Sequence, residues 1–242
     1  SGQWKGRKPR FDLYQLLQEN VYPGRGIVMG RSADGKKLMV AYFIMGRSEN
    51  SRNRIFVSTE DGIRTEAHDP AKMVDPSLII YHPVRRVGQR LVVTNGDQTD
   101  TIRDALAQGG SFDAALETRC FEPDAPNFTP RISAMAMLDG TPRYDMSILK
   151  SADASGTACN RFTFRYAALP GVGHFLHTYA CDGSPIPSFT GEPEPVAMTD
   201  SLDELAQKIW GSLNEQNKVS LYVSETDLAT GVSAERIINK HA

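Results

Sequence analysis

The feature that most constrains the fold of this chain is a series of short apolar runs joined in pairs by glycine-containing turns. The first two runs, residues 26–30 and 37–45, flank Asp34-Gly35, where glycine supplies the positive φ that a tight hairpin turn requires. Runs of this length are typical of β-strands, and the short turns predict antiparallel pairing. Three further pairs follow, at 78–86 and 90–94, at 132–138 and 144–149, and at 161–168 and 174–180.

Helical patterns are few and lie between these hairpins. The clearest covers residues 202–213, where Leu202, Leu205 and Ile209 share one face, and Ser201 with Glu204 forms a capping box. Because helices do not alternate with every strand, the pattern opposes a doubly wound parallel sheet and favours an α+β fold with antiparallel sheets. Shorter helices are predicted within 11–17, from a cap at 101–104, at 112–118 and at 234–240. Single strands are predicted at 54–58, 63–67 and 219–224. A proline-rich loop is predicted at 182–197.

Composition excludes several classes of protein. With 27 Lys and Arg against 29 Asp and Glu, the net charge of −2 argues against a surface devoted to nucleic acid or an acidic membrane. No apolar run approaches the roughly 18 residues of a membrane-spanning helix, and the polar, basic start has no signal-peptide core. Three widely spaced cysteines fit reduced thiols in the cytoplasm. We expect a lead-in over residues 1–20 and a single domain over 21–242.

Several well-known site motifs are absent from the sequence, among them the phosphate-binding loop and the zinc-protease helix. Gly24, Gly26 and Gly30 nearly form a dinucleotide fingerprint, but the third glycine falls one position late and no βαβ pattern surrounds it. His174 and His177 are three residues apart in a predicted strand. That spacing places them on opposite faces and does not favour a shared metal ion.

One segment, GRSENSRNR at residues 46–54, combines three arginines and two asparagines between two predicted strands. Each guanidinium presents a planar, permanently charged fork that suits phosphate or carboxylate. The segment has two interpretations, an anion site at a strand edge or a solvated loop, and composition alone favours the loop.

Two other segments place polar groups beside the end of a predicted strand. TNGDQTDT, at 94–101, leads into a helix, and its two aspartates would repel a phosphate. It either contacts hydroxyl or amide groups of a ligand or simply caps the helix. EPDAPNFTPR, at 122–131, is stiffened by prolines and carries Glu122 and Arg131 at its ends. It is either part of a site or a surface loop with an ordinary ion pair.

Five motifs follow one another in a distinctive order: YPGRG (22–26), GRSENSRNR (46–54), YHPVR (81–85), VVTNGDQTDTI (92–102) and TPRI (129–132). The ordered set resembles the stand-alone, archaeal-type inosine monophosphate (IMP) cyclohydrolase family. The resemblance implies a four-layer αββα sandwich of antiparallel sheets, similar to the N-terminal nucleophile hydrolase fold. It does not imply an N-terminal nucleophile, because a cyclohydrolase forms no acyl-enzyme.

The resemblance also implies an activity in purine biosynthesis. Members of the family close the ring of 5-formamidoimidazole-4-carboxamide ribonucleotide, with loss of water, to give inosinate. We therefore expect a hydrolase acting on cyclic amidines that uses no cofactor and no metal. Its partner would be a small purine ribonucleotide. We expect no nucleic-acid partner and no membrane partner, and a homo-oligomer is possible. The alternative is a non-catalytic nucleotide-binding module on the same fold.

The matched motifs and the chemistry together indicate the site residues. Ring closure needs a donor for the developing oxyanion and a proton for the departing oxygen, and Tyr81 and Glu122 suit these tasks. A carboxyl group shielded from water would have its pKa raised toward neutrality. Arg54 completes the expected catalytic set, and the phosphate is assigned to the segment 47–54. The resemblance implies a substrate-binding set of Arg25, Arg47, Asn53, Asn95, Gly96, Asp97, Thr99, Thr129 and Arg131.

Overall fold

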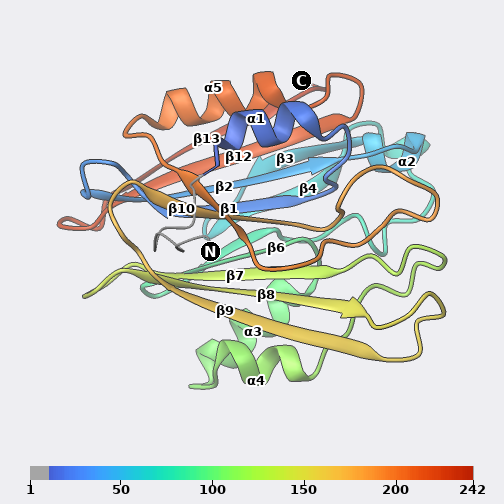
Figure 1. Ribbon diagram of the computed structural model, residues 1–242, viewed down its shortest axis with the longest axis horizontal. Helices are drawn as coiled ribbons and strands as arrows, with labels where there is room; N and C mark the ends of the chain where they lie inside the picture. The colour runs from blue at the N-terminus through green and yellow to red at the C-terminus, as the bar shows by residue number, and fades with distance from the viewer. Residues whose placement is uncertain (1–10, 242) are drawn as a thin grey trace, which may run out of the picture.

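A computed structural model describes residues 11–241 as two antiparallel sheets with helices on their outer faces (Figure 1). Every pairing between the strands of these sheets is antiparallel, which confirms the predicted α+β class. The six-stranded sheet has the order β11 (Glu194–Ala197), β10 (Val172–His177), β1 (Gly26–Arg31), β2 (Lys37–Met45), β12 (Lys218–Asp227) and β13 (Ser233–Asn239). The seven-stranded sheet has the order β3 (Arg54–Ser58), β4 (Gly62–Ala67), β5 (Val84–Val87), β6 (Arg90–Thr94), β7 (Arg131–Met137), β8 (Arg143–Ser151) and β9 (Cys159–Ala167).

The layers stack in the order helix, sheet, sheet, helix. The helices α1 (Leu13–Glu19) and α5 (Leu202–Ser212) cover the six-stranded sheet, and α3 (Gln98–Ala107) and α4 (Phe112–Glu117) cover the seven-stranded sheet (Figure 1). One apolar core lies between the sheets, and a further core lies under each helical layer. The single turn α2 (Glu49–Arg52) and the 3₁₀ turn η1 (Pro70–Lys72) lie outside these layers, in the connections around β3 and after β4.

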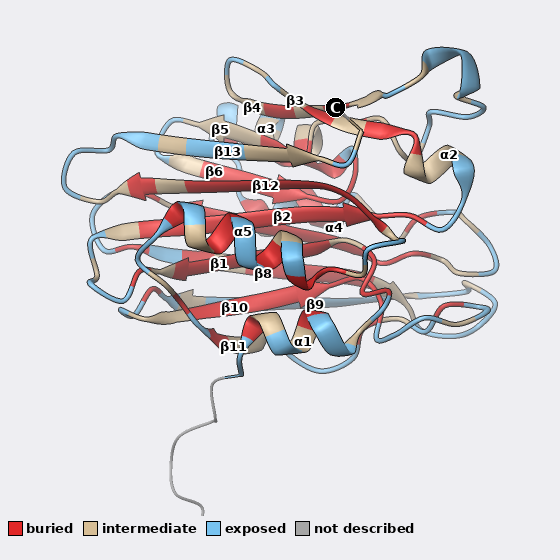
Figure 2. Cartoon of the chain, turned by 90° about the horizontal axis from the view of Figure 1, so that it is seen from above, coloured by how far each residue is buried: buried red, intermediate tan, exposed pale blue. Residues whose placement is uncertain are grey.

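Strand β2 shows why the sequences of the central strands are continuous apolar runs. Its side chains alternate between the core that separates the sheets and the core under α1 and α5. Both faces are therefore buried, and Figure 2 shows β1, β2 and β12 almost wholly buried beneath α5. The Tyr42 side chain faces the seven-stranded sheet, in the core between the two sheets. Its hydroxyl group lies beside Tyr81, in the connection between β4 and β5.

Helix α5 confirms the strongest helical prediction, apart from one detail of its cap. Ser201 accepts a hydrogen bond from the backbone N–H of Glu204 at 3.1 Å, and Leu205 and Ile209 are buried against the sheet. The capping-box prediction is wrong for the Glu204 side chain. It accepts instead from Thr199 at 2.6 Å and pairs with Lys208, one helical turn away.

The predicted helix at 234–240 is wrong, because this segment forms strand β13. Ile237 and Ile238 pair with Tyr222 and Leu221 of β12, and the backbone of β13 satisfies the open edge of that strand. A short segment with two consecutive β-branched residues gains more from sheet pairing than from an isolated final helix. The proline-rich stretch at 182–197 is likewise not all loop, because its end forms β11.

Two other element boundaries differ from their predictions. Residues 78–81 do not extend β5: the N–H groups of Ile79 and Ile80 donate to the carbonyl of Pro76, which makes a turn. The cap expected at 101–104 is also wrong, because α3 begins at Gln98 and Asp97 holds the N-cap position.

The N-terminal part of the described chain packs onto the main body. Leu13 and Leu17 of α1 are buried in the core that α5 also lines. Residues 1–10 of the expected lead-in lie outside the described residues, and the division at residue 21 stays a prediction. Within residues 11–241, no helix combines the length and hydropathy needed to cross a membrane.

Candidate active site

A cavity of about 290 Å³ lies at one end of the sandwich, where several strands of both sheets begin or end. Its walls come from the residues before β1, the segment around α2, the turn before β5, the loop before β7 and the segment after β10. This volume lies near the lower end of the range for small-molecule sites. The lining residues are Tyr22, Arg25, Arg47, Ser48, Ser51, Arg54, Leu78, Ile79, Tyr81, Asn95, Glu122, Asp124, Asn127, Thr129, Tyr179 and Ile186.

Arg54 occupies the first position of β3 and is only 2% exposed. Its Nε donates to the carbonyl of Ser51 at 2.7 Å, and its Nη1 donates to the carbonyl of Ile79 at 3.3 Å. These bonds hold the guanidinium group at the cavity wall, while its buried Nη2 has no hydrogen-bond partner among the described residues. A buried donor without a partner is costly, so Nη2 is suited to a ligand acceptor.

Tyr81 reaches the cavity from a turn rather than from the strand that the sequence predicted. Its backbone N–H donates to Thr65 Oγ1 at 2.9 Å and its carbonyl accepts from the Thr65 N–H at 2.9 Å, which fixes the turn to β4. Its ring is 7% exposed, and its hydroxyl lies 2.5 Å from the hydroxyl of Tyr42. Burial raises the pKa of Tyr81, although Arg54 opposes this, so the phenol is protonated at neutral pH and can donate a hydrogen bond.

Glu122 has the properties of a proton-transfer group. Its side chain is 4% exposed, and its backbone N–H donates to the carbonyl of Thr129 at 2.9 Å, which closes the loop before β7. No hydrogen bond or ion pair within residues 11–241 involves its carboxyl group, so the alternative of a surface acid paired with Arg131 does not hold. Burial raises the pKa of Glu122 to about 7, although Arg25 opposes the shift. A carboxyl group with this pKa can both accept and donate a proton near neutral pH.

Two more arginines complete the cationic lining. Arg25 lies 5.6 Å from the ring centroid of Tyr179, and its guanidinium group makes no hydrogen bond with the rest of the described chain. Arg47 is at the exposed end, where its Nη1 pairs with Asp182 at 2.7 Å and its guanidinium carbon lies 5.4 Å from the ring centroid of Tyr22. Three arginines thus face two carboxylates, those of Glu122 and Asp124, and the cavity favours an anion.

Asn95 and Thr129 line the cavity, but their polar groups are already used within the protein. The Asn95 amide donates to the carbonyl of Pro130 at 2.9 Å and accepts from the N–H of Ile132 at 2.9 Å. Thr129 Oγ1 lies 2.5 Å from both Asp124 Oδ2 and the hydroxyl of Tyr179. These bonds shape the wall of the cavity and hold the loop that carries Glu122.

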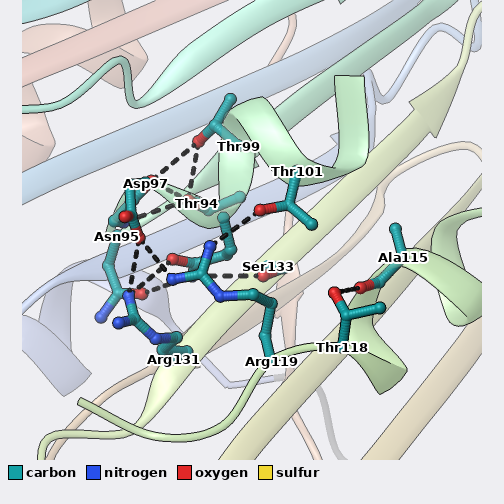
Figure 3. Close-up of polar contacts among 12 residues, drawn as sticks. Thr94, Asn95, Asp97, Thr99, Thr101, Ala115, Thr118, Arg119, Arg131 and Ser133 are labelled. Carbon is teal, nitrogen blue, oxygen red and sulfur yellow. Dashed lines mark hydrogen bonds and ion pairs between the residues drawn. The ribbon is translucent and has the colours of Figure 1, made fainter. Parts of the chain in front are cut away.

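Asp97 and its neighbours form a separate ionic cluster beside the cavity (Figure 3). Asp97 is bound by Arg119 at 2.6 Å and by Arg131 at 3.3 Å, and Figure 3 shows both guanidinium groups converging on it. Thr99 bonds to Thr94 at 2.7 Å, which ties the start of α3 to the end of β6. The structure therefore places Gly96, Asp97, Thr99 and Arg131 outside the residues that line the cavity.

Asn53 is also placed apart from the cavity, although its neighbour Arg54 lines it. Its amide exchanges two hydrogen bonds with the backbone of Asp69, at 2.8 and 2.7 Å, and so ties α2 to η1. Asn53 is the C-cap residue of α2, one position before β3 begins, and these two hydrogen bonds direct its side chain to η1 rather than to the cavity.

Several lining residues were not predicted from the sequence. Four of them lie within or beside the quoted motifs and predicted strands: Tyr22, Asp124, Asn127 and Tyr179. Nothing in their local sequence pattern distinguished them from ordinary strand and loop residues. Tyr42 does not line the cavity but contacts the hydroxyl group of Tyr81; it lies in an apolar run, where its own hydroxyl group was the one available signal. In the described part of the chain, no group of His, Cys, Asp or Glu side chains is arranged to hold a metal ion.

Together, the fold and the cavity define an α+β sandwich protein with a cation-lined site that contains a carboxyl group shielded from water. The family model described as IMP cyclohydrolase-like protein matches residues 22–230, and the chain belongs to this family.

Curated relatives named IMP cyclohydrolase come from methanogens. The protein of Methanococcus aeolicus is 29% identical over 172 residues, which cover 66% of this chain and 75% of the relative. The protein of Methanopyrus kandleri is 37% identical over 117 residues, or 47% of this chain and 57% of the relative. The protein of Methanococcus maripaludis is 32% identical over 124 residues, which cover 49% of this chain and 60% of the relative. The matched regions thus span less than two thirds of the length of two of these three relatives.

Proposed function

We propose that this protein is an IMP cyclohydrolase, which closes 5-formamidoimidazole-4-carboxamide ribonucleotide to inosinate and water. The observation that carries the proposal is the buried Glu122 carboxyl group, whose pKa is raised to about 7 and which shares a cavity with Tyr81 and three arginines. Family membership supports the same reaction. The helix–sheet–sheet–helix layering agrees with an N-terminal nucleophile hydrolase-like fold, and we propose a cytoplasmic setting because the cysteines are few and widely spaced.

The distribution of charge indicates how the substrate lies. Arg47 is at the exposed end, where its ion pair with Asp182 is accessible to solvent and can be exchanged for a phosphate. Arg25, Arg54 and Tyr81 lie deeper, close to Glu122. In this arrangement the ribose phosphate contacts the segment 47–54 and the imidazole substituents reach the buried end.

Ring closure then requires two proton movements. The carboxamide nitrogen attacks the formyl carbon, a C–N bond forms, and the formyl oxygen takes up negative charge and then a proton. The proton that the formyl oxygen takes up replaces one lost by the carboxamide nitrogen. The formamide nitrogen then loses its proton, the C–O bond breaks, and the oxygen leaves as water with a second proton while the C=N bond to the formamide nitrogen is completed. Glu122, with a pKa near 7, can accept the proton from nitrogen and return it to the leaving oxygen.

The developing oxyanion requires donors that are in place before the reaction. The Tyr81 hydroxyl and the unpartnered Nη2 of Arg54 are fixed by the fold and need no reorganisation. Arg25 supplies further positive charge without a hydrogen-bond partner of its own in the described chain. Asn53, Asp97 and Thr99 stay predicted binding residues, although each is hydrogen-bonded within the protein.

The proposal is tested by incubating the purified protein with the formamido ribonucleotide and following inosinate by absorbance. We expect turnover without added metal or cofactor, and loss of turnover in Glu122→Gln. A protein that binds inosinate but never forms it would favour the alternative of a non-catalytic nucleotide-binding module.

A further inference from the structure

Tyr42 lies behind Tyr81, on the side away from the cavity. It belongs to β2, is fully buried in the core between the sheets, and does not line the cavity. Its ring stacks on Phe56 with centroids 5.9 Å apart and an interplanar angle of 19°, which fixes the ring plane. Its hydroxyl group lies 2.5 Å from the hydroxyl group of Tyr81, a short hydrogen bond between two phenols.

The surroundings decide which phenol donates. The Tyr42 hydroxyl has no other hydrogen-bond partner within residues 11–241, and the neighbouring core residues are apolar. If Tyr81 were the donor, the proton of Tyr42 would be buried without an acceptor, at a cost typical of an unsatisfied polar group. If Tyr42 is the donor, the proton of Tyr81 is directed to the cavity, where water or substrate can accept it. The second arrangement leaves no buried group unpaired.

The charges around the pair favour the same arrangement. Arg54 on β3 and Arg25 before β1 place positive charge near the Tyr81 oxygen, while Glu122 faces it from the loop before β7. Burial raises the pKa of Tyr42 well above its ordinary value, so this phenol keeps its proton. An oxygen that accepts a hydrogen bond becomes a stronger donor through its own O–H group.

We propose that Tyr42 is a positioning residue: it donates to the Tyr81 oxygen and thereby directs the proton of Tyr81 to the reacting oxygen of the substrate. The inference rests on the proposed function, because it assigns Tyr81 as the donor to the oxyanion. Tyr42 itself touches no substrate atom. Its effect is to hold the Tyr81 hydroxyl in a single donor direction before the substrate arrives.

The test compares Tyr42→Phe with the wild type. The phenyl ring keeps the stacking on Phe56 and removes only the hydroxyl group. We expect kcat to fall roughly 10- to 100-fold, as for the loss of a hydrogen bond to a developing charge. KM should stay within about twofold, because Tyr42 does not line the cavity. The loss of activity at high pH, where Tyr81 ionises, should move to higher pH because the phenolate loses a donor.

Tyr144→Phe is the matched control. Tyr144 is also fully buried between the sheets, and its hydroxyl is hydrogen-bonded to His174 at 2.6 Å, outside the residues that line the cavity. It loses the same atom from the same core, so a merely structural effect should appear in both variants. A drop in kcat confined to Tyr42→Phe supports the proposal, and an equal drop in the two variants overturns it.

A second measurement does not depend on turnover. Tyrosine labelled with ¹³C at Cζ reports ionisation by NMR, and the resonance of Tyr81 is identified by its loss in Tyr81→Phe. We expect its titration midpoint to rise in Tyr42→Phe and to stay unchanged in Tyr144→Phe. An unchanged midpoint in Tyr42→Phe overturns the inference. Absence of inosinate formation by the wild type, with the midpoint still shifted, would refute the proposed function and leave the hydrogen-bond direction supported.

Discussion

The cavity and the Asp97 cluster are built from the same kinds of side chain, yet they use them differently. In the cluster, the Asp97 carboxylate is 61% exposed and bound by two arginines (Figure 3). In the cavity, Glu122 is buried without a partner in the described chain, and Arg54 carries an unpartnered donor. Arg131 in the cluster also has a buried Nε without a partner among the described residues, but its charge is paired with Asp97. A charge paired within the protein stabilises a turn, whereas a charge left unpaired in a buried cavity is available to a ligand. Matched substitutions in the two regions test this difference.

The largest effect is expected from Glu122→Gln. The amide keeps the shape of the side chain but cannot carry the proton, so kcat should fall by roughly 10²–10⁴ with little change in binding. Steady-state rates of inosinate formation and calorimetric binding of inosinate measure the two effects. Asp97→Asn, which makes the same chemical change in the cluster, should keep more than about half of the wild-type kcat. Similar losses in both variants would remove the distinction between the two regions.

Tyr81→Phe should lower kcat by roughly 10²–10³, because it removes the donor to the developing oxyanion. The phenyl ring still fills the wall of the cavity, so KM should change little. If Tyr81→Phe and Glu122→Gln both keep more than about a third of the wild-type kcat, the catalytic assignment is wrong.

Glu122→Gln should also change stability in a pH-dependent way. The pKa of Glu122 is raised from 4.5 to about 7, so the folded state holds this proton more tightly than the unfolded chain. Its contribution to stability is fully present below pH 4.5 and is lost as the pH rises toward 7, at a cost approaching about 3 kcal/mol. Urea unfolding at pH 4 and pH 8 should show the variant gaining stability relative to the wild type at the higher pH. A difference that does not vary with pH would contradict the burial of the carboxyl group.

Arg54→Ala should raise KM by roughly tenfold or more, because the cavity loses a charged donor that faces the ligand, and should also lower kcat, because the same group is a donor to the developing oxyanion. Arg119→Ala is the matched change in the cluster, where the guanidinium group is already bound to Asp97 and Thr101. Its KM should stay within about twofold of the wild type. Equal KM values for the two variants would place the anion site elsewhere.

The smallest effect is expected on the stability of Asp97→Asn. The variant weakens two ion pairs of a carboxylate that is 61% exposed, and should lower the free energy of unfolding by about 1 kcal/mol or less. Thermal unfolding measures the change. A loss of several kcal/mol would mean that the cluster holds the adjacent cavity together.

Local patterns were sufficient for most of the fold and for part of the site. Glycine turns predicted the pairs β1–β2, β5–β6 and β7–β8, and the apolar stripe of 202–213 predicted α5. The predicted pairing of 161–168 with 174–180 is wrong, because the chain crosses between the sheets at Pro170-Gly171: β9 pairs with β8, and β10 pairs with β1 and β11. The family motifs indicated Arg54 and Tyr81, the resemblance and the proline-stiffened segment 122–131 indicated Glu122, and these three share one cavity. The same motifs also included Asp97 and Thr99, which do not line the cavity and are hydrogen-bonded or ion-paired within the protein. A motif marks residues that occur together but does not separate those that face a ligand from those that support the loop.

The sequence by itself determined the antiparallel α+β class, because strand-length apolar runs with tight turns leave few other ways to bury their side chains. Only the tertiary structure decided that residues 233–239 form an edge strand, since the pairing depends on the open edge of β12. It also decided that Tyr42, 39 residues from Tyr81 in the chain, reaches the Tyr81 hydroxyl group. Burial and hydrogen bonding between distant residues set the protonation of Glu122 and the direction of the Tyr81 proton. These interactions depend on the packing of two sheets and are not encoded in a local pattern.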